Sequence, residues 1–281
     1  MATEMTVLKK ILSGIFTYFV IIFTILVSVF PILWVIMSSF KTNGEILGSP
    51  FSLPSSISFD AYQYLFQEYD FLTYFFNSLL VSVVPTLVSL LFFTMGAYVI
   101  AKFKFWGRNL FYALFTITLL VPAHSRTQPI FSMIIDMDLY NTKWGLMLVY
   151  LSAGMAMSMF ILKAGFQAVP NELSEAARLD GASFWKVFAT VNLPLAKNAM
   201  VTAGVLMFLA NWNEFYYANL LVTSTANRTL PVVTILFNSM FSYNYTNTFA
   251  ALVVVIIPGI IIYAIAQKQV QQSLASSAVK G

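Results

Sequence analysis

The sequence predicts an all-α membrane protein with six transmembrane helices and one long cytoplasmic loop between the fourth and the fifth. The first observation is that 59% of the 281 residues are hydrophobic and only 9% are charged, whereas soluble domains are about a quarter charged. The second is the hydropathy of the chain. With a mean hydropathy of +0.80, a globular chain would expose large apolar patches to water. The third observation is that the apolar residues form long runs without the two-residue alternation of β-strands. Lipid is therefore the expected solvent for most of the chain.

The first predicted span is a helix that stays in the membrane. Its charge-free run extends from Ile11 to Phe40, whereas the apolar region of a cleavable signal peptide has roughly 7 to 15 residues. A helix needs about 20 apolar residues to cross the hydrocarbon core. We expect a single transmembrane domain over residues 1–281, with spans at 12–36, 74–100, 109–131, 144–164, 198–222 and 248–267. The Tyr-, Asn- and Ser-rich stretch before the last span is expected to be a loop or a short re-entrant element.

Lysine and arginine indicate the orientation, because cytoplasmic loops are enriched in these residues. With the N-terminus inside, six spans leave only Lys41, Arg126, Lys143 and Arg228 outside or near the outer boundary. The others fall inside: Lys9, Lys10, Lys102, Lys104, Arg108, Lys163, Arg178, Lys186, Lys197, Lys268 and Lys280. We therefore expect a multi-pass protein of the cell (inner) membrane with both termini in the cytoplasm.

Several kinds of chemistry are excluded by residue type. The chain has no cysteine and one histidine, His124, so disulfides, Cys-based metal sites and a multi-His metal site cannot form within it. No GxxxxGK[ST] phosphate loop occurs, so the chain cannot hydrolyse ATP by itself. A membrane enzyme is disfavoured because there is no pair of membrane carboxylates, histidine cluster or nucleophile elbow.

One long polar segment, at residues 167–196, interrupts the apolar chain and contains EAARLDGASFWKVFATVNLP. Pro170-Asn171 is the turn signal before this stretch, and the Ala-rich run after Ser174 favours a helix. Gly181 then ends or bends that run. The pattern predicts two short helices around a glycine, lying at the membrane surface.

The spacing in this segment resembles the EAA loop of ABC-importer membrane subunits. Glu175-Ala176-Ala177 is followed by Gly181 and then by Val191-Asn192-Leu193-Pro194, with Val191 where the family usually has Ile. Other segments also resemble this family: WVIMSSFK, Asn77-Ser78-Leu79, AYVIAKFKFWGR, LYNTKWGLML and ANWNEFYYA. Most of the chain thus resembles permeases of the carbohydrate-uptake group, which includes the six-span maltose-transporter permease.

The resemblance implies how transport would be powered. In the family, the EAA loop fits a groove on a separate ATPase, which binds ATP and Mg, so this chain itself needs no cofactor. The implied partners are a second membrane permease, a cytoplasmic ABC ATPase dimer and an extracytoplasmic sugar-binding protein. The implied ATPase-coupling residues are Glu172, Glu175, Ala176, Ala177, Asp180, Gly181, Leu193 and Pro194.

Glu214 is the carboxylate within a predicted span, where a charge is expensive unless it faces an aqueous cavity or a partner. Its neighbours carry amides and aromatic faces that suit a sugar, which makes Asn211, Trp212, Asn213, Glu214 and Tyr217 the candidate substrate pathway. The alternative is an interhelical hydrogen bond, or a cap where the helix breaks. On a continuous helix, Asn211, Glu214 and Phe215 would share one face, and Trp212 and Tyr216 another.

His124 and Arg126 lie near the outer end of the third predicted span, where an interface or gate position competes with a ligand contact. Taken together, the sequence predicts a permease subunit that forms half of the pathway of an ATP-driven importer for an oligosaccharide or related carbohydrate. The alternative is a permease for another small polar solute, such as a polyol or glycerol phosphate.

Overall fold

The protein is described by a computed structural model that covers residues 2–237 and 243–278, and its secondary-structure elements are helices. Contacts divide the chain into two compact units. Unit 1 comprises Met1–Asp70 and Thr234–Val254, and unit 2 comprises Phe71–Val233 and Val255–Gly281. The last helix, α15 (Tyr245–Ala278), begins in unit 1 and continues in unit 2.

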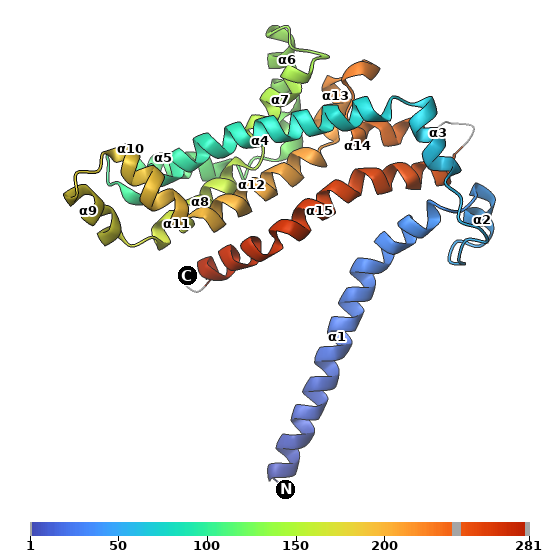
Figure 1. Ribbon diagram of the computed structural model, residues 1–281, viewed down its shortest axis with the longest axis horizontal. Coiled ribbons are helices and arrows are strands. Elements are labelled where there is room, and N and C mark those ends of the chain that lie inside the picture. The colour runs from blue at the N-terminus through green and yellow to red at the C-terminus, as the bar shows by residue number, and fades with distance from the viewer. Residues whose placement is uncertain (1, 238–242, 279–281) are drawn as a thin grey trace. The chain divides into compact units, whose positions relative to one another are not determined.

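Unit 1 is organised around the C-terminal end of the long helix α1 (Ala2–Ser38), drawn in blue in Figure 1. None of the residues in the apolar window of α1 is buried, which fits a helix surrounded by lipid. At its end, the Trp34 ring packs edge-on against Phe249 of α15, with centroids 5.1 Å apart. The unit also contains α2 (Asn43–Gly48), α3 (Asp60–Glu68) and the 3-10 helix η4 (Thr234–Phe237).

Unit 2 is built on α4 (Phe71–Lys102), which packs against α7 (Lys143–Leu151), α8 (Met155–Ala168) and α12 (Lys197–Trp212). Small residues let these helices approach closely, as is usual for helices packed in membranes. A Cβ added to Gly165 of α8 would lie 2.3 Å from the Ala199 Cβ of α12. Ala97 of α4 and Ala203 of α12 are fully buried in the same core. The four helices form the scaffold on which the remaining elements of this unit are placed.

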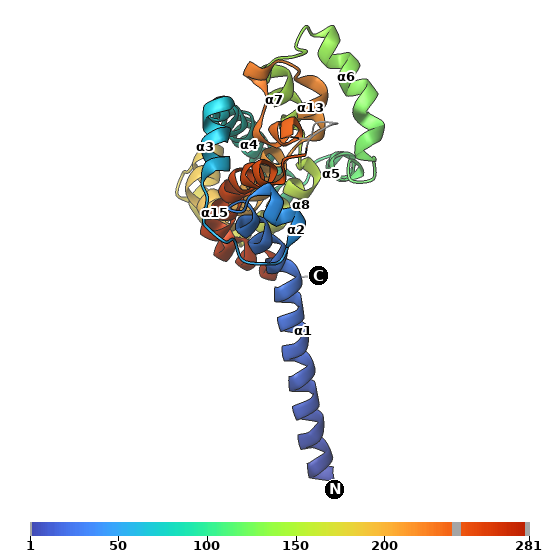
Figure 2. The ribbon, with the colours of Figure 1, turned by 90° about the vertical axis from the view of Figure 1, so that its right-hand side faces the viewer.

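Apart from the C-terminal part of α15, the remaining elements of unit 2 are short. Figure 2 shows α5 and α6 as separate helices that run in different directions. In chain order the unit also contains α5 (Arg108–Ile117), η1 (Ala123–Arg126), α6 (Thr127–Asp136), α9 (Asn171–Leu179), α10 (Phe184–Val187), η2 (Phe188–Asn192), α11 (Leu193–Leu195), α13 (Tyr216–Leu221), η3 (Thr225–Asn227) and α14 (Leu230–Val233).

Within the described residues, three helices are long and apolar enough to cross a membrane, and two bent pairs raise the number to as many as five. The single helices are Ser13–Ser38, Phe71–Lys102 and Tyr245–Lys268, where spans were expected. The pairs are Lys143–Leu151 with Met155–Ala168, bent by 46°, and Phe184–Leu195 with Lys197–Trp212, bent by 76°.

Three predicted spans are not continuous helices, which corrects the sequence-based expectation. The span at 109–131 is interrupted after Ile117, and Pro122 precedes the next helical turn with an extended ψ of 135°. Proline removes a backbone donor and disfavours the helical conformation of the residue before it. The span at 144–164 breaks at Gly154, which has a φ of +70°, and the span at 198–222 breaks between Trp212 and Tyr216.

The close approach of α8 and α12 makes Gly165 sensitive to added volume. We expect Gly165→Val to push the helices apart and to destabilise the folded protein by about 1–3 kcal/mol, as for other overpacked cores. Thermal unfolding in detergent measures this effect. The matched control is Gly14→Val in α1, where an added Cβ meets nothing within 4 Å. Equal midpoints for the two variants would contradict the close packing.

Candidate functional site

The break between α12 and α13 places the Glu214 carboxylate at the start of a new helix. Its Oε1 accepts a hydrogen bond from the Tyr217 backbone N–H at 2.8 Å, and its Oε2 accepts one from the Ala218 N–H at 3.0 Å. The Tyr150 hydroxyl of α7 donates to Oε2 at 2.7 Å. A carboxylate is favoured at a helix N-terminus because it pairs with the free N–H groups and the positive end of the helix dipole. The cap expected as one alternative for Glu214 is therefore present.

The same carboxylate also borders a cavity, so capping and pathway roles are compatible. The cavity has a volume of about 350 Å³ and lies at the break between α7 and α8. Glu214 and Arg126 bring opposite charges to its wall, and Tyr150 and Tyr217 add hydroxyl groups. The other lining residues are Thr118, Leu119, Ile130, Val149, Ser152, Ala153, Gly154, Met155, Ala156 and Met157. This mixture of apolar, aromatic and polar groups is typical of small-molecule sites.

Of the five candidate pathway residues, Glu214 and Tyr217 line the cavity, and the other three do not. Asn211 is buried and donates to the Thr86 hydroxyl at 3.1 Å. Trp212 is 1% exposed, and its Nε1 donates to the Val255 carbonyl at 2.8 Å. The exposed Asn213 side chain donates back to a carbonyl one turn earlier. The expectation that Asn211 and Glu214 share a helix face was wrong, because α12 ends at Trp212.

Arg126 reaches the cavity from η1, and this segment lies against α13. Among the described residues, the buried Nε atom of Arg126 has no hydrogen-bond partner. The His124 ring stands edge-on to the Tyr216 ring with centroids 5.0 Å apart, and the Thr127 and Tyr216 hydroxyl oxygens are 3.0 Å apart. His124 thus occupies an interface, whereas Arg126 belongs to the cavity. Tyr150 was missed, because one hydroxyl within an apolar run gives no sequence signal.

The polar segment at 167–196 forms two short helical arms around Gly181, as expected. The first arm is α9, and the second runs from α10 through η2 to α11. α9 ends before Gly181, whose φ of +81° is a conformation that side chains with a Cβ disfavour. α10 follows, capped by Ser183, and then a single π-helical turn, a feature often found at functional sites. The fully buried Asn192 joins the arms, because its Nδ2 donates to the Ser174 hydroxyl at 3.0 Å and to the Val187 carbonyl at 3.3 Å.

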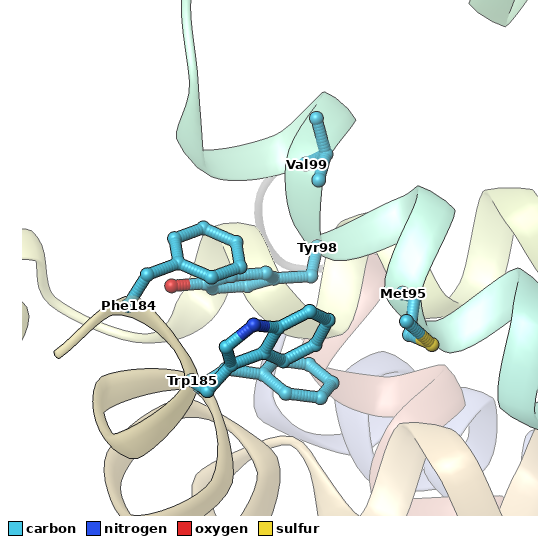
Figure 3. A pocket seen from close by; sticks show the side chains of 6 residues that line it. Met95, Tyr98, Val99, Phe184 and Trp185 are labelled. Atoms are coloured by element: carbon cyan, nitrogen blue, oxygen red, sulfur yellow. The ribbon is translucent and has the colours of Figure 1, made fainter.

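An aromatic cluster of Tyr98, Phe103, Phe166, Phe184 and Phe188 holds the second arm against α4 and α8. Ring centroids lie 4.8 Å apart for Tyr98 and Phe188, and 5.7 Å apart for Tyr98 and Phe184. Figure 3 shows Tyr98, Phe184 and Trp185 gathered around an apolar pocket of about 60 Å³. A movement of this arm would therefore be transmitted to the scaffold helices through close-packed rings.

A lysine ties the first arm to the same helix. Lys102, at the end of α4, donates to the Asn171 Oδ1 at 2.9 Å and to the Val169 carbonyl. Away from these contacts the segment is open to solvent. The exposed predicted coupling residues are Glu172, Glu175, Ala176, Asp180, Gly181 and Pro194, and those of intermediate exposure are Ala177 and Leu193. The segment is thus fixed on one side and free on the other.

Residues 93–276 match the family described as "Binding-protein-dependent transport system inner membrane component". The chain belongs to this family. It is therefore a multi-pass inner-membrane permease of an ABC importer rather than an enzyme, and the predicted family membership is confirmed.

Individual relatives extend over nearly the whole chain. The chain is 35% identical over 247 residues to the diacetylchitobiose uptake system permease protein NgcG of Streptomyces coelicolor, covering 87% of this chain and 82% of that protein. It is 30% identical to the trehalose transport system permease protein SugB of Mycobacterium tuberculosis, covering 94% and 98%. Among solved structures, a bacterial ABC transporter involved in the import of the acidic polysaccharide alginate matches with a TM-score of 0.79 and 27% identity, over 91% of this chain and 95% of that one.

The hydrogen bond from Tyr150 to Glu214 should stabilise the folded protein at the break between α12 and α13. Tyr150→Phe removes the donor, and because bonds to charged groups contribute roughly 1.5–3 kcal/mol, we expect a loss of about that size. In a Glu214→Gln background the same substitution should lower the free energy of unfolding by clearly less. Denaturant unfolding of all four forms measures the coupling, with Tyr263→Phe, a half-exposed tyrosine of α15, as control. Additive losses would show that the two side chains act independently.

Proposed function

We propose that the chain is the permease subunit of an ATP-driven sugar importer and forms half of its translocation pathway. The observation that carries the proposal is the cavity in which Glu214, Arg126, Tyr150 and Tyr217 meet. Hydroxyl, carboxylate and guanidinium groups can exchange hydrogen bonds with sugar hydroxyls, and the tyrosine rings offer apolar faces. The family and its diacetylchitobiose and trehalose relatives support a sugar as the solute.

The arrangement in the membrane is proposed to be six spans with both termini in the cytoplasm. The lysine and arginine distribution supports this orientation, and α5 with α6, interrupted between Ile117 and Thr127, would supply the span beyond the five candidates. We further propose that a second permease completes the pathway, that a cytoplasmic ABC ATPase dimer supplies ATP and Mg, and that an extracytoplasmic sugar-binding protein delivers the solute.

A neutral sugar is favoured over glycerol phosphate by the charges at the cavity. Arg126 would attract a phosphate, but Glu214 on the same wall would repel it. A polyol would satisfy the same polar groups while leaving the aromatic faces less covered. The aromatic faces therefore place oligosaccharides before polyols, and the charges place phosphorylated solutes last.

Radiolabelled uptake tests the solute class. A strain that lacks this gene should lose uptake of one or more neutral oligosaccharides and keep that of glycerol phosphate. Complementation with Glu214→Gln should change the rate or selectivity of uptake several-fold, because the substitution keeps the size of the side chain and removes its charge.

Two results would contradict this proposal. Loss of glycerol phosphate uptake alone would show that the transported solute is an anion and not a neutral sugar. Parental uptake by Glu214→Gln, together with a lower thermal stability of the complex, would confine Glu214 to capping α13.

The segment at 167–196 is proposed to couple the permease to the ATPase. Its exposed acidic residues Glu172, Glu175 and Asp180 suit a basic groove. Its other side is fixed to α4 by Lys102 and by the aromatic cluster. Closure of the ATPase would then move α4 and α8, and the first turn of α8 lines the cavity, without contact between ATP and this chain.

Charge reversal on this segment should disrupt coupling. Glu175→Lys should weaken binding of the ATPase, because losing one buried charged partner can cost roughly 2–5 kcal/mol. Gly181→Asp should also weaken it, because its positive φ disfavours a Cβ by about 1 kcal/mol or more. Pull-down of the ATPase, with ATP hydrolysis and uptake in liposomes, measures both.

Matched substitutions in unit 1 provide the controls. Glu68→Lys reverses an exposed charge on α3, and Gly44→Asp adds a carboxylate where a Cβ meets nothing within 4 Å. Both should leave ATPase retention unchanged. Parental transport by Glu175→Lys and Gly181→Asp would show that the segment connects two helices and does not couple the permease to the ATPase.

A further inference from the structure

The loop that connects α1 with α3, and that includes the last turn of α2, has a long stretch without charge. From Ile46 to Phe59 it carries no charged residue. Within it, Phe51, Leu53 and Ile57 are 72%, 79% and 70% exposed. Single exposed apolar residues are ordinary, but several together mark a surface that contacts something other than water.

This loop folds back along α1 instead of extending away from it. The Phe51 ring lies against Phe30 and against Trp34, with ring centroids 6.2 Å apart in each case. Both partners belong to the candidate membrane span Ser13–Ser38. At a rise of 1.5 Å per residue, they lie about 12 Å and about 6 Å before the end of α1. Phe51 is therefore level with residues of the span itself.

The backbone of the loop is satisfied by the protein at the point where it meets the span. The Pro50 carbonyl accepts hydrogen bonds from Trp34 Nε1 at 2.8 Å and from Lys41 Nζ at 3.0 Å. The Ser49 carbonyl accepts from Lys41 Nζ at 3.2 Å and from the Ser52 hydroxyl at 2.9 Å.

Lys41 is fully buried, and its partners are two carbonyls and a serine hydroxyl rather than a carboxylate. Burying an ammonium group is expensive, and in water the carbonyls would be hydrated without it. The arrangement suits a place where water is scarce, because backbone groups there must find partners within the protein.

The polar side of the loop is closed by Glu45. Its carboxylate accepts hydrogen bonds from the Ser55 hydroxyl and from the backbone N–H groups of Ser55 at 3.0 Å and Thr42 at 2.9 Å. These bonds, led by that of the Ser55 hydroxyl, lower the pKa of Glu45 from 4.5 to about 2. The ionised Glu45 carboxylate therefore stabilises this loop conformation above pH 4.5, and the contribution is lost as the pH falls towards 2.

We propose that residues 46–57 form an interfacial membrane anchor that inserts Phe51, Leu53 and Ile57 into the lipid leaflet at this end of α1. Lipid is the occupant that the geometry favours, because the Phe51 ring continues the exposed apolar surface of α1, and Leu53 and Ile57 are exposed in the same loop. Trp34 lies beside Phe51, and tryptophan is enriched at membrane interfaces. Interfacial helices bury their apolar face about 5–10 Å into the headgroup and acyl boundary, and we expect a similar depth for these side chains. This inference goes beyond the proposed transport function.

Site-directed spin labelling tests the anchor, because the chain has no cysteine. Leu53→Cys and Ile57→Cys would each carry a nitroxide in the full transporter, reconstituted in vesicles of phosphatidylethanolamine and phosphatidylglycerol. Collisions with O2, which concentrates in lipid, and with a water-soluble nickel chelate are then compared. References on the same chain are Ile22→Cys in the span and Asp60→Cys at the start of α3. The O2-to-nickel ratio at positions 53 and 57 should exceed that at position 60 several-fold and approach that at position 22.

Two outcomes would overturn the anchor. A ratio equal to that at position 60 would place the loop in water. Weak collisions with both reagents would show that another protein, either the second permease or a binding protein, covers it. Neither result depends on uptake, so the transport proposal is tested separately.

A second variant tests the role of the buried ammonium. Lys41→Met leaves the carbonyls of Ser49 and Pro50 with fewer donors, so the loop should move towards water and the ratio at position 53 should fall at least twofold. Lys104→Met removes an exposed lysine and should leave the ratio unchanged. An unchanged ratio in Lys41→Met would refute the proposed role of Lys41.

Discussion

The constraint on which the structure depends is that backbone N–H and C=O groups in lipid must find partners inside the protein. A continuous helix meets this requirement by itself, but unit 2 contains helices that break. At two of the breaks, after α7 and after α12, a polar side chain bonds the free backbone groups. Glu214 accepts from the first turn of α13, and Ser89 of α4 donates to the Leu151 carbonyl at the end of α7, at 2.6 Å. Isolated polar residues of an apolar chain thus have a structural role at these two helix ends.

Helix α4 supplies many of these side chains and therefore fixes the geometry of unit 2. At one end, the buried Asn77 donates to the carbonyls of Ala226 and Arg228 at 2.9 and 3.0 Å, and accepts from Lys143 at 3.1 Å. At the other end, Lys102 holds the start of α9, and Tyr98 forms the centre of the aromatic cluster. Both candidate sites are consequently positioned by one helix, which gives the proposed coupling a physical route.

The cavity and the helix breaks coincide. An interrupted helix exposes backbone groups and admits polar side chains, so it can border a cavity that a polar solute could occupy. The cavity lies where α7 gives way to α8 and where α12 gives way to α13. Glu214 therefore serves two needs with one carboxylate, because the charge that caps α13 also faces the cavity.

The sequence by itself determined the membrane class, the long single spans and the segment at 167–196. Composition reports directly on the solvent, and the glycine and its spacing within that segment are local features, so Gly181 could be predicted to take an unusual backbone conformation. The tertiary structure alone decided which of residues 211–217 border the cavity. Apolar composition does not reveal where a helix stops, and after Trp212 the Glu214 carboxylate bonds Tyr150 of α7 and the first turn of α13. It also brought Arg126 to the same wall as Glu214, because that meeting joins segments far apart in the chain and leaves no local pattern.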